Sequence, residues 1–358
     1  MRALAAIAVM TFHFSSAGIW DAAPFSAVVE HGARGVFVFF VLSGFLVFRP
    51  FVEGPVDTGG YALKRVLRIM PAYIAALVLV TLLTGDPMLR QHPLEFLLLL
   101  QNYDLALFQH LVPTAWTLVL EMQFYLLLPM AALALIPVMR RWPALGAAVL
   151  VAVGLVSIVL LMWAYVVPPF EPAVIISSSL PALLWAFIPG MLVAQVLVTN
   201  PAAAARLATD RVALLAGGLI CLGWMSGGTY LLDVLAELGL AVGVALLIPW
   251  LVRPRTHDVR PVRSLAWFGV VVSYPFYLWH RTVMDQVQPW HLAGATAWIV
   301  VLMLTTAVGV VSYWVIERPA IRLASRLSAG PHPAAAIRAS VTSRRHGSVP
   351  TATAHPEG

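Results

Sequence analysis

Three residues inside long apolar stretches of the chain have side chains that can bind or release a proton. Glu121 interrupts the run TAWTLVLEMQFYLLLP at 114–129, and His13 and His280 interrupt two other runs. A carboxylate at the centre of a lipid-buried helix costs roughly 2.5–3.5 kcal/mol on insertion scales, so such groups usually face a protein interior and mark function. The alternative, a lone polar residue satisfied by a neighbour, explains any one of them about equally well.

The positions of His13 and Glu121 within their stretches predict a similar depth in a membrane. Each lies about ten residues from the start of its stretch, which at 1.5 Å per residue is roughly 15 Å. If the two stretches enter from opposite sides, both side chains reach the midplane, with His280 nearer the outer face. A histidine and a carboxylate at matching depth favour a catalytic pair over two unrelated polar residues.

Basic residues flank the same stretches at spacings that could bind an anion. Arg2 and His13 are separated by eleven helical steps, roughly 16 Å along the axis and about 20° past three full turns, so they share a helix face. In YALKRVLRIMPAY at 61–73, Arg65 and Arg68 are three residues apart, also share a face, and lie beside Lys64. Such a pair can hold phosphates through forked hydrogen bonds. A topological role for Arg2, and lipid-headgroup anchoring for the cluster, are the alternatives.

The composition requires that these residues be positioned by membrane helices. Of the 358 residues, 61% are hydrophobic and only 11% are charged, whereas a soluble domain is about 25% charged. The net charge of +6 could indicate nucleic acid, but the arginines lie in short gaps between apolar runs, which suits membrane topology better. We therefore expect no nucleic-acid partner. The single cysteine, Cys221, excludes an internal disulfide framework.

The apolar runs predict the fold class, an all-α polytopic transmembrane helix bundle of about ten spans, since roughly 20 residues cross the hydrocarbon as a helix. They lie at about 3–20, 35–51, 69–84, 111–139, 144–167, 181–199, 211–229, 234–252, 264–285 and 294–316. The shorter run at 94–108 contains Asn102 and Asp104 and predicts an interfacial or re-entrant segment. We assign residues 1–328 to one membrane domain and 329–358, rich in Ala, Pro, Ser and His, to a disordered cytoplasmic tail.

The basic residues also predict the orientation of the bundle. With ten spans and a cytoplasmic N-terminus, 19 of the 22 Lys and Arg residues lie on the cytoplasmic side, and only Arg34, Arg90 and Arg281 lie outside. Short loops rich in positive charge stay in the cytoplasm. The sequence therefore predicts a multi-pass protein of the inner (plasma) membrane with both termini cytoplasmic.

Six motifs in order make the chain similar to the acyltransferase-3 family of integral membrane acyltransferases. The resemblance runs from residue 2 to about 327 and rests on RALAAIAVMTFH, GVFVFFVLSGFLVFRPF, KRVLRIMPAY, WTLVLEMQFYLLLP, VSYPFYLWH and SYWVIERPA. The first has an arginine and a histidine with ten residues between them, in register with Arg2 and His13. One departure is Arg281, where the family often has an aromatic residue.

The resemblance implies transfer of an acyl group, often acetyl, from cytoplasmic acyl-CoA to a hydroxyl, with acyl-CoA as co-substrate and no metal. His13 is then the general base or carries the acyl group itself, Glu121 orients His13 and stabilises its cation, and Arg2 steers the pantetheine. Arg65 and Arg68, with Lys64, hold the CoA phosphates. The remaining motif residues expected at the substrate site are Ser43, Trp116, Tyr125 and His280.

The acceptor stays open at this stage. The family modifies envelope polysaccharides and lipids, peptidoglycan, and secreted antibiotics such as macrolides. We expect an envelope glycan or lipid, with a secreted macrolide-type metabolite as the alternative. A proton-coupled transporter using His13, Glu121 and His280 as a relay is a further alternative, which the Arg65–Arg68 pair disfavours. A non-catalytic scaffold is disfavoured by the intact His13 and Glu121.

Overall fold

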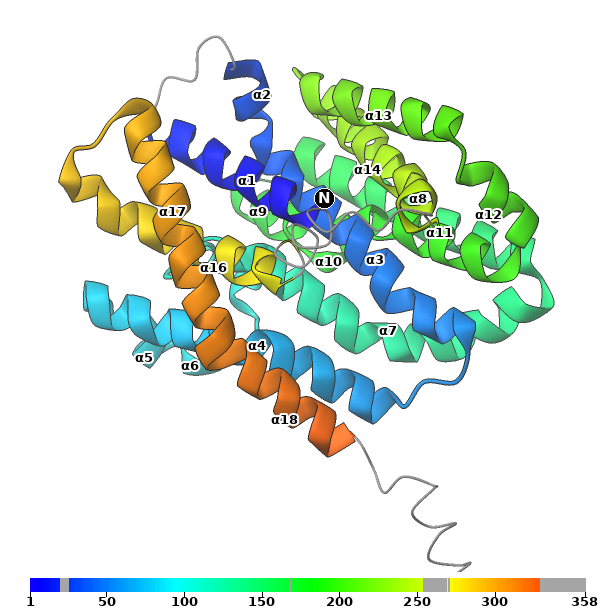
Figure 1. The fold of residues 1–358 in the computed structure, drawn as a ribbon, viewed down its shortest axis with the longest axis horizontal. Coiled ribbons are helices and arrows are strands. Elements are labelled where there is room, and N and C mark those ends of the chain that lie inside the picture. Colours follow the sequence, from blue (N-terminus) through cyan, green and yellow to red (C-terminus); the bar gives the residue numbers. More distant parts are fainter. Residues whose placement is uncertain (20–25, 168, 254–268, 270, 329–358) are drawn as a thin grey trace, which may run out of the picture.

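Every regular element of the described chain is a helix, as the sequence predicts (Figure 1). The computed structural model describes residues 1–19, 26–167, 169–253, 269 and 271–328. The tail predicted at 329–358 lies outside these residues, so the domain boundary at 328 stays a prediction.

The helices vary widely in length. The first half contains α1 (Arg2–Ser16), α2 (Ser26–Glu30), η1 (Gly32–Arg34), α3 (Gly35–Glu53), α4 (Thr58–Thr84), α5 (Met88–Gln91), α6 (Pro93–Leu97), η2 (Gln101–Tyr103), α7 (Ala115–Arg141) and α8 (Pro143–Val166). The second half contains α9 (Phe170–Ser177), α10 (Leu180–Leu183), η3 (Leu184–Ala186), α11 (Ile188–Thr199), α12 (Pro201–Leu207), α13 (Asp210–Met225), α14 (Tyr230–Val252), α16 (Ser273–Val287), η4 (Gln288–Trp290), α17 (Gly294–Ser312), the π-helical turn η5 (Tyr313–Glu317) and α18 (Arg318–Ser328).

The number of membrane-capable helices is smaller than the ten predicted. Among the residues that the structure describes, six helices are long and apolar enough to cross a bilayer, and up to eight if two pairs bent by 46° and 62° each count as one span. The other two predicted spans fall on α1 and α16, each of 15 residues, and residues 264–268 and 270 of the span predicted at 264–285 lie outside the described residues. At 1.5 Å per residue such a helix is roughly 22 Å long, short of the ~30 Å hydrocarbon thickness. The membrane class is therefore supported, and the count of ten is not.

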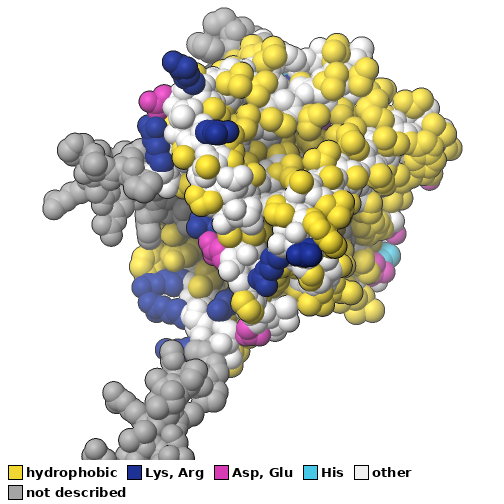
Figure 2. Space-filling model, turned by 90° about the vertical axis from the view of Figure 1, so that its right-hand side faces the viewer, with side chains coloured by type: hydrophobic (Ala, Val, Ile, Leu, Met, Phe, Trp, Pro, Cys, Tyr) yellow, Lys and Arg dark blue, Asp and Glu magenta, His cyan; other side chains and the backbone are white. Residues whose placement is uncertain are grey.

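The surface of the bundle is strongly apolar. Large hydrophobic side chains are exposed on many helices, including Leu82, Leu133 and Phe170, each at least 75% exposed. Figure 2 shows hydrophobic side chains over most of one face, with the Lys and Arg side chains gathered along one side of it. So much exposed apolar area is typical of a surface covered by lipid.

The segment predicted to be re-entrant is short and irregular. It holds only the short helices α6 and η2, and Leu99 adopts a positive φ of 58° between them. The fully buried Asn102 donates from Nδ2 to the carbonyls of Trp116 and Ser178. The segment is thus tied into the bundle and does not cross it as a continuous helix.

Five helices surround the candidate site. They are α1, α3, α4, α7 and α16. α3 contacts α1 and α7, α4 contacts α7 and α16, and α16 also contacts α1. In Figure 1, α3 and α7 run through the middle of the bundle, while α4 and α18 lie side by side at one edge. α11 packs on the other side of α3.

Candidate active site

The buried carboxylate of Glu121 has two direct polar partners, Ser43 and Arg2. Ser43 Oγ donates to Glu121 Oε1 at 2.6 Å, and Tyr125 OH lies 2.9 Å from Ser43 Oγ. Because the Ser43 proton goes to the carboxylate, Tyr125 donates to Ser43. Arg2 Nη2 lies 4.0 Å from the same Oε1. A buried carboxylate is tolerated when it is hydrogen-bonded and paired with a cation, and both conditions hold here.

Close helix packing sets the position of Ser43. A Cβ on the next residue, Gly44, would lie 2.1 Å from the carbonyl oxygen of Phe187, and one on Gly190 would lie 2.0 Å from that of Val41. Small residues let membrane helices approach this closely. α3 is therefore held against α11 on one face while it presents Ser43 to α7 on another. Glu121 and Tyr125 are four residues apart on α7 and so share the face that meets Ser43.

A cavity of about 290 Å³ opens beside Glu121 and is lined by three arginines. Arg2 reaches it from α1, and Arg65 and Arg68 reach it from α4. The other lining residues are Ser43, Leu46, Val47, Ile69, Glu121, Tyr125 and Tyr274. The guanidinium of Arg65 lies 5.5 Å from the ring centroids of both Tyr61 and Tyr125, which holds it by cation–π attraction. Nε of Arg2 and of Arg65 are buried without a hydrogen-bond partner in the described chain. Such a group of guanidiniums is suited to an anion with several oxygens.

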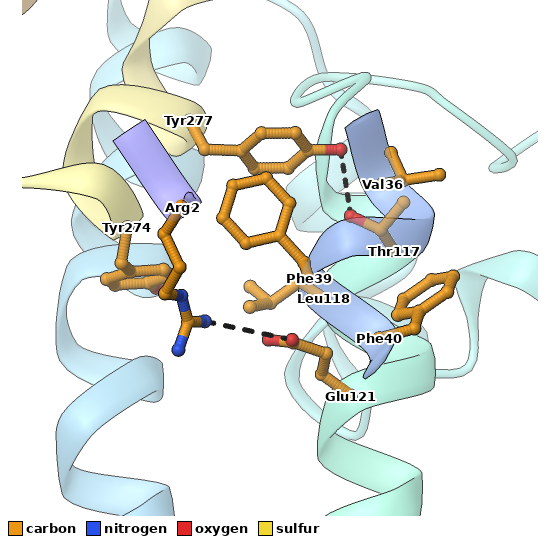
Figure 3. A pocket seen from close by; sticks show the side chains of 9 residues that line it. All are labelled: Arg2, Val36, Phe39, Phe40, Thr117, Leu118, Glu121, Tyr274 and Tyr277. Atoms are coloured by element: carbon orange, nitrogen blue, oxygen red, sulfur yellow. Dashed lines mark hydrogen bonds and ion pairs between the residues drawn. The ribbon is translucent and has the colours of Figure 1, made fainter. Parts of the chain in front are cut away.

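A second, much smaller cavity of about 30 Å³ shares Arg2, Glu121 and Tyr274 with the first. Figure 3 shows it enclosed by Phe39, Leu118 and Tyr277, with Arg2 and Glu121 facing each other at one end. Tyr277 OH lies 2.9 Å from Thr117 Oγ1. The two cavities therefore adjoin at Arg2, Glu121 and Tyr274. The smaller one, here called the passage, is lined mainly by apolar side chains and extends to Tyr277, and His13 and His280 are not among the described residues that line either cavity.

The two histidines meet beyond Tyr277. His13 Nδ1 lies 2.8 Å from His280 Nε2, and His280 Nδ1 lies 2.7 Å from the carbonyl oxygen of Tyr277. The ring centroids of Tyr277 and His280 are 5.6 Å apart. His280 is fully buried, whereas His13 is partly exposed. These contacts bring together two of the residues named from the sequence.

The expected contact between His13 and Glu121 is not formed. In the described chain His13 contacts His280, and Glu121 contacts Ser43 and Arg2. α7 begins at Ala115, four residues later than its apolar run, and Glu121 lies in its second turn. Arg2, at the opposite end of α1 from His13, reaches Glu121 instead.

Two other residues named from the sequence lie away from the cavities. Lys64 is exposed and is absent from the cavity lining. Trp116 packs near Phe108, with ring centroids 6.5 Å apart, and its carbonyl accepts from Asn102. Lys64 and Trp116 therefore stabilise or flank the site without lining it.

Two lining residues, and one buried carboxylate outside the cavity linings, were not singled out from the sequence. Tyr274 and Tyr277 line the cavities, and with His280 they recur every three residues in VSYPFYLWH, so helical spacing alone could have placed them on one face. Glu317, in the last motif, is 2% exposed and accepts from Ser312 Oγ at 3.1 Å. It lies in the π-helical turn η5, a distortion that is frequent at functional sites.

Comparison with known proteins identifies the class to which this fold and site belong. A family model described as an acyltransferase domain, that of the acyltransferase-3 family, matches residues 1–316. The chain belongs to this family of acyltransferases and is an enzyme. No solved structure matches it significantly.

Individual relatives are distant. Nodulation protein 10 of Rhizobium leguminosarum bv. viciae is 27% identical over 83% of this chain and 84% of its own length. Exopolysaccharide production protein ExoZ of Rhizobium meliloti is 28% identical over 84% of this chain and 93% of its own. A Staphylococcus aureus protein named "Putative O-acetyltransferase" is 24% identical over 89% of this chain, and the match spans only 56% of that protein.

Proposed function

We propose that this acyltransferase moves an acetyl group from cytoplasmic acyl-CoA to a hydroxyl of a cell-envelope glycan or glycolipid. The observation that carries the proposal is that an arginine-lined cavity beside Glu121, a small apolar cavity that extends to Tyr277, and the histidine pair held by the Tyr277 carbonyl lie in succession. A donor with phosphates at one end and a thioester at the other suits a route that is cationic at its mouth and apolar further in.

The residues have separate roles along this route. Arg65 and Arg68 bind the phosphates of the donor, and Arg2, held by Glu121 and lying 5.4 Å from the Phe39 ring centroid, directs the thioester arm into the passage. His13 takes the proton of the acceptor hydroxyl as general base. The hydroxyl oxygen then bonds to the acyl carbon, the C–S bond breaks, and the thiolate leaves as CoA, which accepts the proton from His13. Acylation of His13 itself remains the alternative order of the same transfer.

The direction of transfer follows from the positions of the charges. Arg140, Arg141, Arg206 and Arg253 lie near helix ends that the sequence assigns to the cytoplasm, as do Arg65 and Arg68 on α4. In this orientation the donor enters from the cytoplasm of a bacterial inner membrane and the partly exposed His13 lies towards the outer face. The acceptor then reaches His13 from the outer side.

The names of the relatives favour a glycan among the possible acceptors. One is named "Exopolysaccharide production protein ExoZ" and another "Putative O-acetyltransferase". Neither name points to a macrolide, so we place the secreted metabolite second. Membership of an acyltransferase family also removes the reason to propose a proton-coupled transporter.

The proposal is tested with purified protein in nanodiscs, acetyl-CoA radiolabelled in the acetyl group, and oligosaccharides released from the envelope of the host cell. We expect CoA thiol release and label in the oligosaccharides. His13→Ala should lower the rate by roughly 10²–10⁴-fold, the usual contribution of a general base. His110→Ala, a half-exposed histidine paired with Asp86, is the matched control and should keep wild-type activity. Absence of acetyl-CoA turnover by the wild type would refute the donor.

A further inference from the structure

We propose that His280 is a positioning residue that fixes the tautomer of His13 and shares its proton, so that the two histidines act as a dyad anchored by the Tyr277 carbonyl. This inference rests on the proposed role of His13 as base. It replaces Glu121, which has other partners, as the group that orients His13.

The hydrogen bonds determine where each proton lies. A carbonyl oxygen can only accept, so the 2.7 Å contact between His280 Nδ1 and the Tyr277 oxygen requires a proton on Nδ1. Neutral His280 then has an unprotonated Nε2, which must accept from His13 Nδ1 at 2.8 Å. Neutral His13, with its proton on Nδ1, is left with the lone pair on Nε2. That nitrogen is the one available to take the hydroxyl proton.

The ring geometry supports an in-line hydrogen bond. The planes of the two imidazoles are inclined by 14° and their centroids are 5.1 Å apart, while the facing nitrogens are only 2.8 Å apart. The rings therefore meet edge to edge in nearly parallel planes, as a bond along the lone pair of Nε2 requires. The anchoring carbonyl belongs to a residue one helical turn earlier on α16, so its position relative to His280 is fixed by the helix.

The dyad also accounts for the burial of His280. His280 is fully buried and has no access to an acceptor, whereas His13 is partly exposed. When His13 Nε2 takes a proton, its Nδ1 proton can shift to His280 Nε2, so that the positive charge is shared by two rings and stabilised by the Tyr277 carbonyl. The neighbouring cation Arg281 is held by Asp285 at 3.2 Å, which reduces its repulsion of that charge. His280 thus acts through His13, and we withdraw it from the residues expected to touch substrate.

Three variants separate positioning from packing. His280→Phe keeps an aromatic ring and removes the acceptor, so kcat should fall roughly 10²-fold, the lower end of a general base's contribution, with the KM for acetyl-CoA unchanged. His280→Gln can place an amide oxygen near the position of Nε2 and should retain much more of the rate. Trp279→Phe, a buried neighbour whose Nε1 has no hydrogen-bond partner in the described chain, is the packing control and should stay near wild type.

These kinetics use acetyl-CoA and envelope oligosaccharides in nanodiscs. Wild-type kcat in a folded His280→Phe protein would overturn the dyad, and so would equal losses in His280→Phe and His280→Gln, because packing alone would then explain both. A wild type without acetyl-CoA turnover would refute the proposed donor. The dyad would then be decided by a direct measurement of the proton positions.

That direct test needs no activity. Nitrogen-15 NMR of histidine-labelled protein, with His13→Asn and His280→Gln spectra used to assign the two rings, reports which ring nitrogen carries the proton. We expect a protonated Nδ1 and an unprotonated Nε2 in both His13 and His280. A protonated Nε2 on neutral His13 would overturn the proposal whatever the kinetics show.

Discussion

The hydroxyl of Ser43 on α3 donates a 2.6 Å hydrogen bond to the Glu121 carboxylate on α7, which also faces the guanidinium of Arg2 at 4.0 Å. Glu121 therefore links three helices at the point where the wide, arginine-lined cavity meets the narrow one. Its negative charge offsets part of the positive charge of Arg2, Arg65 and Arg68. The carboxylate is thus placed to hold Arg2 and to shape the passage, and it does not touch the base.

This arrangement predicts that Glu121→Gln lowers kcat without raising the KM for acetyl-CoA. The amide keeps the shape and removes the charge, so Arg2 loses its partner while the cavity becomes more attractive to phosphates. Ser43→Ala removes one hydrogen bond to a charged group, worth roughly 1.5–3 kcal/mol, and should change the kinetics in the same direction. Steady-state kinetics of both variants provide the check. A raised KM with unchanged kcat would make Glu121 a donor-binding residue only.

Arg34 is predicted to stabilise the fold and to have no part in the chemistry. It is 6% exposed, and it donates from Nη1 to the carbonyls of Gly223, Trp224 and Ser226 at the end of α13 and from Nη2 to Asp233 on α14. These bonds give a structural reason for one of the few basic residues on the predicted outer side. Because Asp233 is 43% exposed, the loss in Arg34→Ala comes mainly from the buried hydrogen bonds of the guanidinium, and a hydrogen bond to a charged group is worth roughly 1.5–3 kcal/mol.

Thermal unfolding in detergent should therefore show a clearly lower midpoint for Arg34→Ala. Arg49→Ala is the matched control, since Arg49 and Glu53 form an exposed i,i+4 pair of a kind worth only about 0.3–0.5 kcal/mol. Equal midpoints for the two variants would show that Arg34 does not hold the α13–α14 hairpin.

Acid sensitivity is predicted at the loop after α4. The backbone N–H of Met88, and then the ring of His110, hydrogen-bond the Asp86 carboxylate and lower its pKa below the ordinary value. A lowered pKa in the folded state stabilises the fold above the ordinary Asp pKa of about 3.9, and this contribution is lost as the pH falls through the lower, folded value.

Asp86→Asn should accordingly remove part of the loss of stability on acidification. Unfolding midpoints of the wild type and the variant, measured from neutral pH to about pH 3, should converge as Asp86 is protonated. Asp57→Asn, at an exposed position, is the control. A constant difference between wild type and Asp86→Asn across the pH range would contradict this account.

The orientation is predicted to place residue 58 in the cytoplasm and residue 171 outside. Both Thr58 and Glu171 are exposed at helix starts, and the exposed Cys221 must first be replaced by serine. Thr58→Cys should then react with an impermeant thiol reagent only after the cells are opened, and Glu171→Cys should react in intact cells. The reverse pattern would invert the proposed entry side of the donor.

The spacing of residues in the sequence predicts which site residues share a helix face. It does not predict which side chains on different helices contact each other. Arg2 and His13 on one stripe, and Arg65 with Arg68 on another, need only the helical period. The partner of His13 does not follow from spacing, because Glu121 meets Arg2 at the opposite end of α1 from His13. That partner depends on the packing of α16 against α1, which hydropathy does not specify.

Arg68 is predicted to bind the donor phosphates. It lines the 290 Å³ cavity with Arg2 and Arg65, so Arg68→Ala should remove one charge-assisted contact worth roughly 1.5–3 kcal/mol. At about 1.4 kcal/mol per decade, that is a ten- to hundredfold loss of affinity for acetyl-CoA. Arg68→Lys should recover only part of it, because an ammonium lacks the forked geometry of the guanidinium.

Lys64 provides the matched control, since it lies one turn away on α4 but is exposed and outside the cavity lining. Lys64→Ala should leave the KM for acetyl-CoA at its wild-type value. If α4 only anchors the bundle to lipid headgroups, arginine and lysine at position 68 become nearly equivalent, and insertion suffers instead of KM. Acetyl-CoA titrations of the three variants in nanodiscs distinguish the two roles, and an unchanged KM in both Arg68 variants would return the motif to lipid anchoring.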